Sequence, residues 1–221
     1  MYIALLLKLF QPAPSAHSLI AVVAAQTELF ALIQHAAVFV KPCVDGRLAA
    51  AAADGFYFRK VLFLKPSVDT RVGGNIVWSR IGLKAEATLI TPAENLEKLY
   101  LEKKETANVI IVDECQFLTE SQIDQLRSLV NDYNIPVMCF GLRTDFLTHF
   151  FPGARRLMEL ADSITEIKTV CACGRKATVN ARIDENGRII TQGDQVFLGG
   201  NDSYVAMCHK CWVSRIKEQE K

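Results

Sequence analysis

The sequence predicts an α/β fold: a parallel sheet with helices on both faces, followed by a small C-terminal β-hairpin domain bound to zinc. Three observations carry this prediction. Strand and helix patterns alternate after residue 58, which is typical of a parallel sheet. An apolar strand at residues 109–112 runs directly into two carboxylates, Asp113 and Glu114. Four cysteines lie in two close pairs near the C-terminus.

Composition restricts the class of protein. The 221 residues are 50% hydrophobic and 22% charged, which is ordinary for a globular chain. A net charge of +1 gives no broad basic field, so we expect no nucleic-acid partner. The apolar stretch at residues 18–40 is interrupted by polar residues, so we expect no membrane span.

Charged residues are distributed unevenly along the chain. Residues 1–57 contain six Asp, Glu, Lys or Arg and fourteen alanines, while residues 58–221 contain the other forty-three charged residues. We therefore divide the chain into an atypical N-terminal segment (1–57), an α/β nucleotide-binding core (58–168) and a zinc-binding domain (169–221).

The first elements of the core follow from local signals. Residues 61–64 form a short apolar strand that Lys65 and Pro66 should close. Thr91 can cap a helix that has Pro92 at its first position and Glu94 three residues after the cap. The inner face of that helix would consist of Leu96, Leu99 and Tyr100.

A second strand, helix, strand unit follows. After the strand at residues 109–112, Thr119 and Gln122 form a capping box. Helical spacing then predicts one inner face, made of Ile123, Leu126, Leu129, Val130 and Tyr133. The sequence predicts a buried strand at residues 135–142 and a helix at residues 154–161. This alternation requires right-handed crossovers between parallel strands.

The C-terminal region predicts a metal-held hairpin. Residues 177–183 alternate like a strand, residues 184–187 contain an Asn-Gly turn, and residues 188–191 can return. Four thiolates suit a closed tetrahedral zinc site with a structural role. His209 is an alternative ligand, and unpaired or disulfide-bonded cysteines are the alternative to zinc. The proposed ligands are Cys171, Cys173, Cys208 and Cys211.

Asp113 and Glu114 are the candidate site for chemistry. Ligands of open α/β sheets collect at the carboxyl ends of the strands. In P-loop NTPase-like folds, an Asp in this position holds Mg²⁺. The alternative is that the carboxylates only cap the helix that follows Thr119. Capping needs one carboxylate, so the pair favours a functional site.

Six motifs in order resemble the zinc-containing type of bacterial thymidine kinase, from about residue 59 to residue 212. They begin at Pro66, Ser79, Asp113, Gly141, Cys171 and Leu198, and read PSVDTR, SRIGL, DECQF, GLRTDF, CACGRKA and LGGNDSY. The resemblance implies ATP-dependent phosphorylation of the 5′-hydroxyl of thymidine. It also implies a cytoplasmic homotetramer with structural Zn²⁺, Mg²⁺ bound with ATP, and feedback inhibition by thymidine triphosphate.

The resemblance also assigns roles to individual residues. Glu114 matches the general base. Asp113, Cys115 and Gln116 match residues that bind magnesium and nucleotide, and Asp113 is the one that helps to hold Mg²⁺. Asp69 and Arg71 match a charged pair near the phosphates. The residues matched to the thymidine site are Phe117, Phe146, Phe151, Arg182, Gln195, Val196, Phe197, Leu198, Gly199 and Tyr204. Plain core packing is the alternative role for the phenylalanines.

The chain departs from the family at its N-terminal segment. Family members begin with a strand and a phosphate loop, G-x-x-x-x-G-K-[ST], whose Lys should lie roughly 26 residues before Asp69. Cys43 occupies that place, and the sequence contains no Gly-Lys-Ser or Gly-Lys-Thr. Either a frameshift or a wrongly chosen start has replaced the phosphate loop, or the protein is a catalytically disabled paralogue that keeps the nucleoside pocket for binding or regulation.

Overall fold

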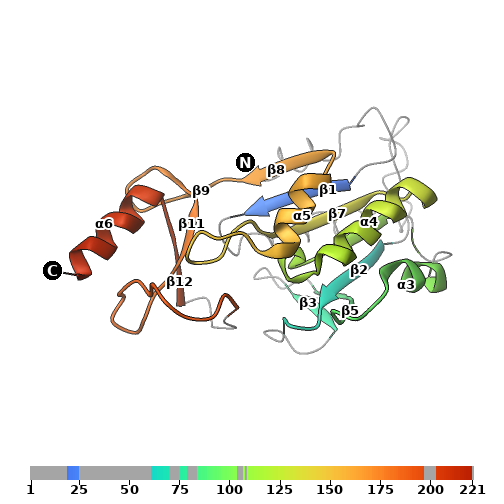
Figure 1. Cartoon of the computed structure of the whole chain (residues 1–221), viewed down its shortest axis with the longest axis horizontal. Helices are drawn as coiled ribbons and strands as arrows, with labels where there is room; N and C mark the ends of the chain where they lie inside the picture. The colour runs from blue at the N-terminus through green and yellow to red at the C-terminus, as the bar shows by residue number, and fades with distance from the viewer. Residues whose placement is uncertain are drawn as a thin grey trace.

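The computed structural model describes residues 19–24, 61–69, 75–78, 84–103, 107, 109–196 and 203–220. Its centre is a six-stranded sheet in the order β5-β2-β6-β7-β1-β8, in which every neighbouring pair is parallel. The strands are β1 (Leu19–Ala24), β2 (Val61–Pro66), β5 (Thr88–Ile90), β6 (Val109–Val112), β7 (Val137–Leu142) and β8 (Ser163–Ile167). The predicted parallel α/β sheet is confirmed (Figure 1).

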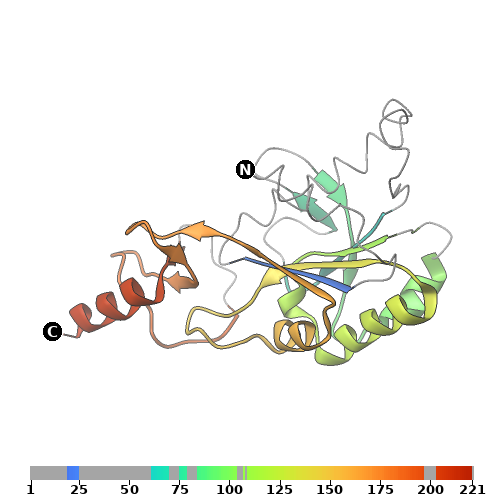
Figure 2. The same cartoon turned by 90° about the horizontal axis from the view of Figure 1, so that it is seen from above.

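Three helices of the core pack side by side on one face of the sheet (Figure 2). They are α3 (Leu96–Lys103), α4 (Glu120–Tyr133) and α5 (Pro152–Leu160). The other face carries a two-stranded antiparallel ribbon of β3 (Ile76–Trp78) and β4 (Lys84–Glu86). The sequence predicts helices on both faces, and the helices in the described part of the core all lie on one.

Of the two predicted helix caps, the one at α4 is present and the one at α3 is not. Thr119 and Gln122 form the predicted capping box at α4. The first four apolar residues of the predicted inner face are buried, whereas Tyr133 is exposed at the end of the helix. The predicted start of α3 at Thr91 was wrong: Oδ1 of Asn95 accepts the Lys98 N–H, and residues 91–94 form a turn before the helix. The inner face of α3 is buried as expected.

Two strands differ from the sequence-based prediction. β2 continues through Lys65 and Pro66, because its pairing with β5 extends to Pro66. β1 was not predicted; it lies between β7 and β8, and a carboxylate oxygen of Asp162 accepts the Leu19 N–H at its start. The sequence of β1 is continuously apolar, and Leu19 at its start is completely buried.

A smaller unit follows the core. It contains β9 (Thr169–Val170), β10 (Lys176–Ala177), β11 (Val179–Arg182), β12 (Tyr204–Met207) and α6 (His209–Gln219). The predicted hairpin is only partly present: an isolated bridge joins Ile183 to Ile189, while β11 pairs over its whole length with β12. This pairing brings the two ends of the cysteine pattern together around a small core of their own. Among the described residues, no helix is long and apolar enough to cross a membrane.

Candidate functional site

Asp113 and Glu114 lie at the carboxyl end of β6, at the edge of the sheet where the neighbouring strands β2 and β7 also end. Asp113 follows β6 directly, and its N–H donates to the carbonyl of Leu64 in β2 at 3.0 Å. Glu114 adopts a left-handed backbone with φ 50°, and the short helical turn η2 (Cys115–Phe117) begins after it. Asp113 is 0% exposed and Glu114 is 7% exposed. Both carboxylates therefore sit at the carboxyl edge of the sheet, inside the protein.

A buried lysine faces this pair from β2. The ammonium of Lys65 lies 3.2 Å from Oδ2 of Asp69, and both side chains are almost completely buried. Burial raises the pKa of Asp113 well above its usual range, and repulsion from Glu114 and Asp69 adds to the shift; Lys65 opposes it. The ammonium of Lys65 thus pairs with Asp69 and partly offsets the negative charge around Asp113.

The arrangement fits a divalent cation. Among the described groups, Oδ2 of Asp113 has no hydrogen-bond partner, although the side chain is fully buried. A cation at this oxygen would offset the repulsion that raises the pKa of Asp113. Carboxylate oxygen is the ligand type that Mg²⁺ prefers.

Cys115 and Gln116 lie in η2, below the acidic pair. The Cys115 thiol is buried, and its burial raises its pKa, so we expect it to be a neutral thiol. The Gln116 amide donates to Oε2 of Glu114 at 2.6 Å and accepts from the Leu142 N–H at 3.0 Å. The side chains of Cys115 and Gln116 are therefore both buried.

The predicted aromatic residues fall into two groups. Phe117 and Phe151 contact each other edge to face, with ring centroids 5.7 Å apart. Phe151 is buried at the start of α5, which also fits the alternative of core packing. Phe146 lies apart from that pair, in the loop that follows β7, and is 2% exposed.

Arg182 joins the second aromatic group to the C-terminal unit. Its guanidinium lies 3.9 Å from the centre of the Phe146 ring, and its Nε donates to the Tyr204 hydroxyl at 3.2 Å. The same side chain donates to the carbonyl of Asp194 at 3.1 Å. Residues predicted separately for the nucleoside site therefore meet where the two parts of the chain adjoin.

Gln195 makes a second link between the two parts. Its Nε2 donates to Oδ2 of Asp145 at 3.0 Å and to the carbonyl of Phe150 at 3.3 Å. Val196 beside it is 40% exposed. The predicted site residues Arg71, Phe197, Leu198 and Gly199 lie outside the described residues, as does Cys43.

The four predicted cysteine ligands form one cluster. The sulfur atoms of Cys171, Cys173, Cys208 and Cys211 all lie within 4.8 Å of one another. Backbone N–H groups of Cys173 and Cys208 lower the pKa of Cys171 to about 6, which favours a thiolate ligand. The hydrogen bonds and repulsion among the sulfurs raise the pKa of Cys211 to about 12, a conflict that a divalent cation would relieve.

This geometry fits the predicted zinc site. The free thiols were a competing interpretation, but four sulfurs at one point match the soft, tetrahedral ligand set of structural zinc. His209 is not a member of the cluster; its ring faces Trp212, with centroids 5.5 Å apart. Within the described residues, the ligand set is thus the four cysteines.

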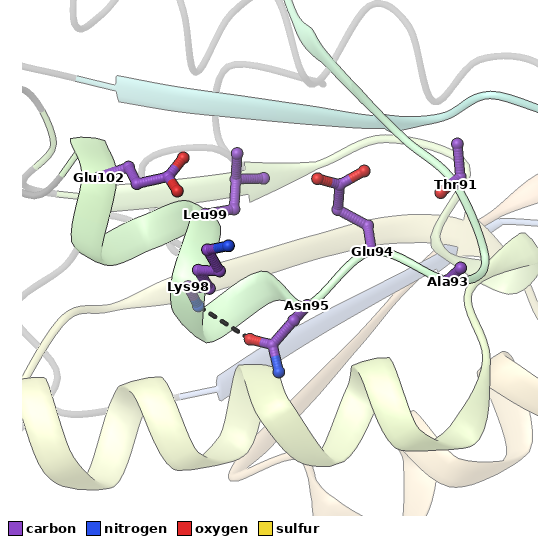
Figure 3. Close-up of a pocket in the computed structure, with 7 residues that line it drawn as sticks. All are labelled: Thr91, Ala93, Glu94, Asn95, Lys98, Leu99 and Glu102. Carbon is purple, nitrogen blue, oxygen red and sulfur yellow. Dashed lines mark hydrogen bonds between the residues drawn. The ribbon is translucent and has the colours of Figure 1, made fainter.

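A pocket along α3 is separate from this site. Its volume is about 340 Å³, and Figure 3 shows its lining side chains along one side of the helix and the turn before it. These residues are Thr91, Ala93, Glu94, Asn95, Lys98, Leu99 and Glu102. None of the residues predicted for nucleotide, nucleoside or zinc lines this pocket.

Sequence reasoning missed Lys65 and Asp145 as site residues. Lys65 was interpreted as the residue that closes a strand, and only its complete burial shows another role. Asp145 was inside a quoted motif but was assigned no function. Its carboxylate accepts from the N–H groups of Leu147 and His149, both at 2.9 Å, as well as from Gln195.

Comparisons of the sequence with a family model and with curated proteins agree on one family. The model of the family "Thymidine kinase" matches residues 56–212. A thymidine kinase from Yersinia pseudotuberculosis is 41% identical over 160 residues, covering 72% of this chain and 82% of the relative. One from Vibrio vulnificus is 49% identical over 146 residues, covering 65% and 76%. Among solved structures, the Yersinia pseudotuberculosis ATPase DotB aligns with a TM-score of 0.38 and 12% identity, covering 78% of this chain and 44% of that one.

Proposed function

Because this chain belongs to the thymidine kinase family, we propose that it transfers the γ-phosphoryl group of ATP to the 5′-hydroxyl of thymidine. The observation that carries the proposal is the turn after β6. It holds Asp113 and Glu114 side by side, buried, at the carboxyl edge of the sheet. Phosphoryl transfer needs a base for the attacking hydroxyl and a site for the metal that accompanies the phosphates.

Glu114 acts as the general base in this proposal. Its carboxylate takes the proton of the 5′-hydroxyl while the nucleoside oxygen bonds to the γ-phosphorus, and the bond from that phosphorus to the β,γ-bridging oxygen breaks to release ADP. Asp113, with an oxygen that has no hydrogen-bond partner among the described groups, would hold Mg²⁺, and Asp69 lies nearby beside Lys65. Bound there, Mg²⁺ would neutralise charge on the phosphates.

The nucleoside would lie between the core and the loop that begins at Gln195. Phe117, Phe151 and Phe146 supply apolar rings at this end of the sheet. Arg182 and Tyr204 support the loop from the C-terminal unit. We assign Arg71, Phe197, Leu198 and Gly199 to the same site from the resemblance alone.

The zinc cluster has a structural role in the proposal. It joins the segment before β10 to the start of α6 and so fixes the base of the loop between β11 and β12. From the family we further propose a cytoplasmic homotetramer that thymidine triphosphate inhibits.

A sequence observation favours a second candidate, a nucleoside-binding protein that does not transfer phosphate. Family members continue from their first strand into a phosphate loop. Here β1 is followed in the sequence by Ala25, Gln26, Thr27 and Glu28, and no Gly-Lys-Ser or Gly-Lys-Thr occurs in the chain. Loss of one preorganised anion donor reduces rates by about 10² to 10³, so loss of the whole loop would remove nearly all transfer.

Two measurements on the zinc-loaded full chain separate the candidates. Thymidine binding is measured by calorimetry, and thymidine monophosphate formation is measured with ATP and Mg²⁺. Binding with transfer supports the kinase, and binding without transfer supports the second candidate. Failure to bind thymidine contradicts both.

The role of Glu114 has a matched control. Glu114→Gln should lower kcat by about 10² to 10⁴, because it removes the base. Glu120→Gln makes the same change at an exposed position in the first turn of α4 and should leave kcat unchanged. Full activity in Glu114→Gln would exclude Glu114 as the base.

A further inference from the structure

The side-chain amide of Gln116 is engaged at both ends. Its nitrogen donates to Oε2 of Glu114 at 2.6 Å, and its oxygen accepts from the Leu142 N–H at 3.0 Å. This orientation of the amide follows from its partners, because a backbone N–H can only donate and a carboxylate can only accept. The side chain is 1% exposed, so water does not compete for these bonds.

The backbone of the turn has an unusual conformation at Glu114, and the hydrogen bonds of Gln116 act next to it. Glu114 has φ 50° and ψ 40°, a left-handed conformation that non-glycine residues rarely adopt. Its own N–H donates to Oδ1 of Asp113 at 2.9 Å, and its carbonyl accepts from the Phe117 N–H at 3.0 Å. The backbone is thus held locally, while Gln116 ties the carboxylate to a different strand.

β7 has space for this amide because residue 141 is glycine. A Cβ at Gly141 would lie 2.5 Å from Oε1 of Gln116 and 2.6 Å from the sulfur of Cys115. Both distances are too short for real contacts, so any larger residue would displace the turn or the amide. The fit between β7 and η2 is therefore specific to a glycine opposite a glutamine.

We propose that Gln116 is a positioning residue for Glu114, and not a ligand of the metal or nucleotide. The amide fixes one carboxylate oxygen of Glu114 and anchors it to the end of β7. This fixes the position of the carboxylate relative to the end of β7, the strand that leads into the loop carrying Phe146. The catalytic part of this inference rests on the proposed function, since it takes Glu114 as the base.

Three variants of the zinc-loaded full chain test the kinetic consequence. Gln116→Met removes the amide, and Gly141→Ala pushes against it without changing residue 116. Both should lower kcat at least tenfold while KM for thymidine changes less than threefold. Gln122→Met is the matched control: Gln122 is also buried and also makes side-chain hydrogen bonds, to the carbonyls of Thr91 and Glu94. It should lower the melting temperature but not kcat per folded molecule.

A second readout does not need activity. In NMR spectra of the parent chain, the side-chain amide protons of Gln116 should exchange with water at least tenfold more slowly than those of exposed Gln192. Glu114→Ala should move these amide-proton signals upfield, because the hydrogen bond to the carboxylate is lost, and Mg²⁺ added to this variant should not shift them further. These results support the positioning role even if the parent chain transfers no phosphate. Absence of transfer would contradict only the proposed kinase activity.

The opposite results overturn the inference. Unprotected Gln116 protons, or amide-proton signals that do not move in Glu114→Ala, would exclude the hydrogen bond. A Mg²⁺-dependent shift of Gln116 in Glu114→Ala would make it a metal ligand. In an active parent, unchanged kcat in Gln116→Met would exclude the positioning role.

Discussion

Lys65 and Asp69 form an ion pair inside the protein, with the ammonium 3.2 Å from the carboxylate and side-chain exposures of 0% and 1%. Lys65 also donates to the carbonyl of Ile76, in the ribbon on one face of the sheet. The pair therefore connects the end of β2, the segment after it and β3. It supplies positive charge next to the acidic turn.

Replacing Lys65 with Met should destabilise the fold by about 3 kcal/mol, because it removes the cation from a buried pair and leaves its charged partner inside. The free energy of unfolding in urea measures this effect. Arg155→Met is the control, because its pair with Glu159 is exposed on α5; it should leave the free energy nearly unchanged. Equal stability of the two variants would show that the Lys65 pair contributes nothing.

Gly153 allows the start of α5 to contact the acidic turn. A Cβ there would lie 2.4 Å from the carbonyl oxygen of Leu118 and 3.0 Å from that of Cys115. Gly153→Ala should cost about 1 to 3 kcal/mol through overpacking, despite the better helix propensity of alanine. It should also lower thymidine phosphorylation per folded molecule, because the displaced carbonyls belong to η2 and its flank.

Gly187→Ala is the comparison for this variant. It introduces strain at φ 73°, in a turn far from the acidic pair along the chain. It should therefore lower stability, measured by urea unfolding, without lowering activity per folded molecule. Equal losses of activity in both variants would argue against a specific role for the α5 contact.

Local signals in the sequence were sufficient for several features. The capping box of Thr119 and Gln122 and the apolar run at residues 109–112 depend on neighbours within a few residues, and the structure confirms both. The cysteine cluster was also predictable, because four soft ligands in two close pairs match the ligand set of structural zinc.

Features that depend on distant partners were not predictable. β1 is apolar enough for a strand, but its place between β7 and β8 requires residues more than a hundred positions away. Lys65 looks like an ordinary strand end until its burial beside Asp69 is known. The same holds for Asp145, whose partner Gln195 lies in another part of the chain.

The zinc cluster should hold the C-terminal unit together. Chelation of zinc from the full chain should expose β11 and β12 to hydrogen exchange while β6 and β7 stay protected, because the unit has its own small core. Hydrogen exchange with mass spectrometry measures both regions. Cys208→Ser should reproduce the effect, and Cys139→Ser, at a buried thiol of β7, should not expose β11 and β12. Continued protection of β11 and β12 without metal would contradict this role.

The same cluster predicts a dependence on pH. The pKa of Cys171 is lowered from 9.0 to about 6 in the folded protein. A lowered pKa stabilises the fold fully above the ordinary thiol pKa, and this contribution is lost as the pH falls through about 6. In the zinc-free protein, the Cys171 thiolate should therefore be protonated as the pH falls through about 6, which ultraviolet absorbance of the thiolate measures. Titration near the ordinary thiol value would contradict the prediction.

The contact between Asp145 and Gln195 should strengthen thymidine binding. Oδ2 of Asp145 accepts from Gln195 at 3.0 Å, and this bond holds the start of the loop against the core. A hydrogen bond to a charged group contributes about 1.5 kcal/mol, which corresponds to roughly a tenfold loss of affinity in Gln195→Met. Asp145→Asn should cause a similar loss, because its amide would face the Gln195 amide.

A double variant distinguishes this bond from two independent effects. If the bond between Asp145 and Gln195 is the cause, Asp145→Asn combined with Gln195→Met should bind thymidine about as weakly as either single variant. Calorimetric titration with thymidine measures all four proteins, and Gln192→Met serves as control because its exposed side chain lies in the same loop. Additive losses in the double variant would show that the two residues act separately, and that the loop is held to the core by other contacts.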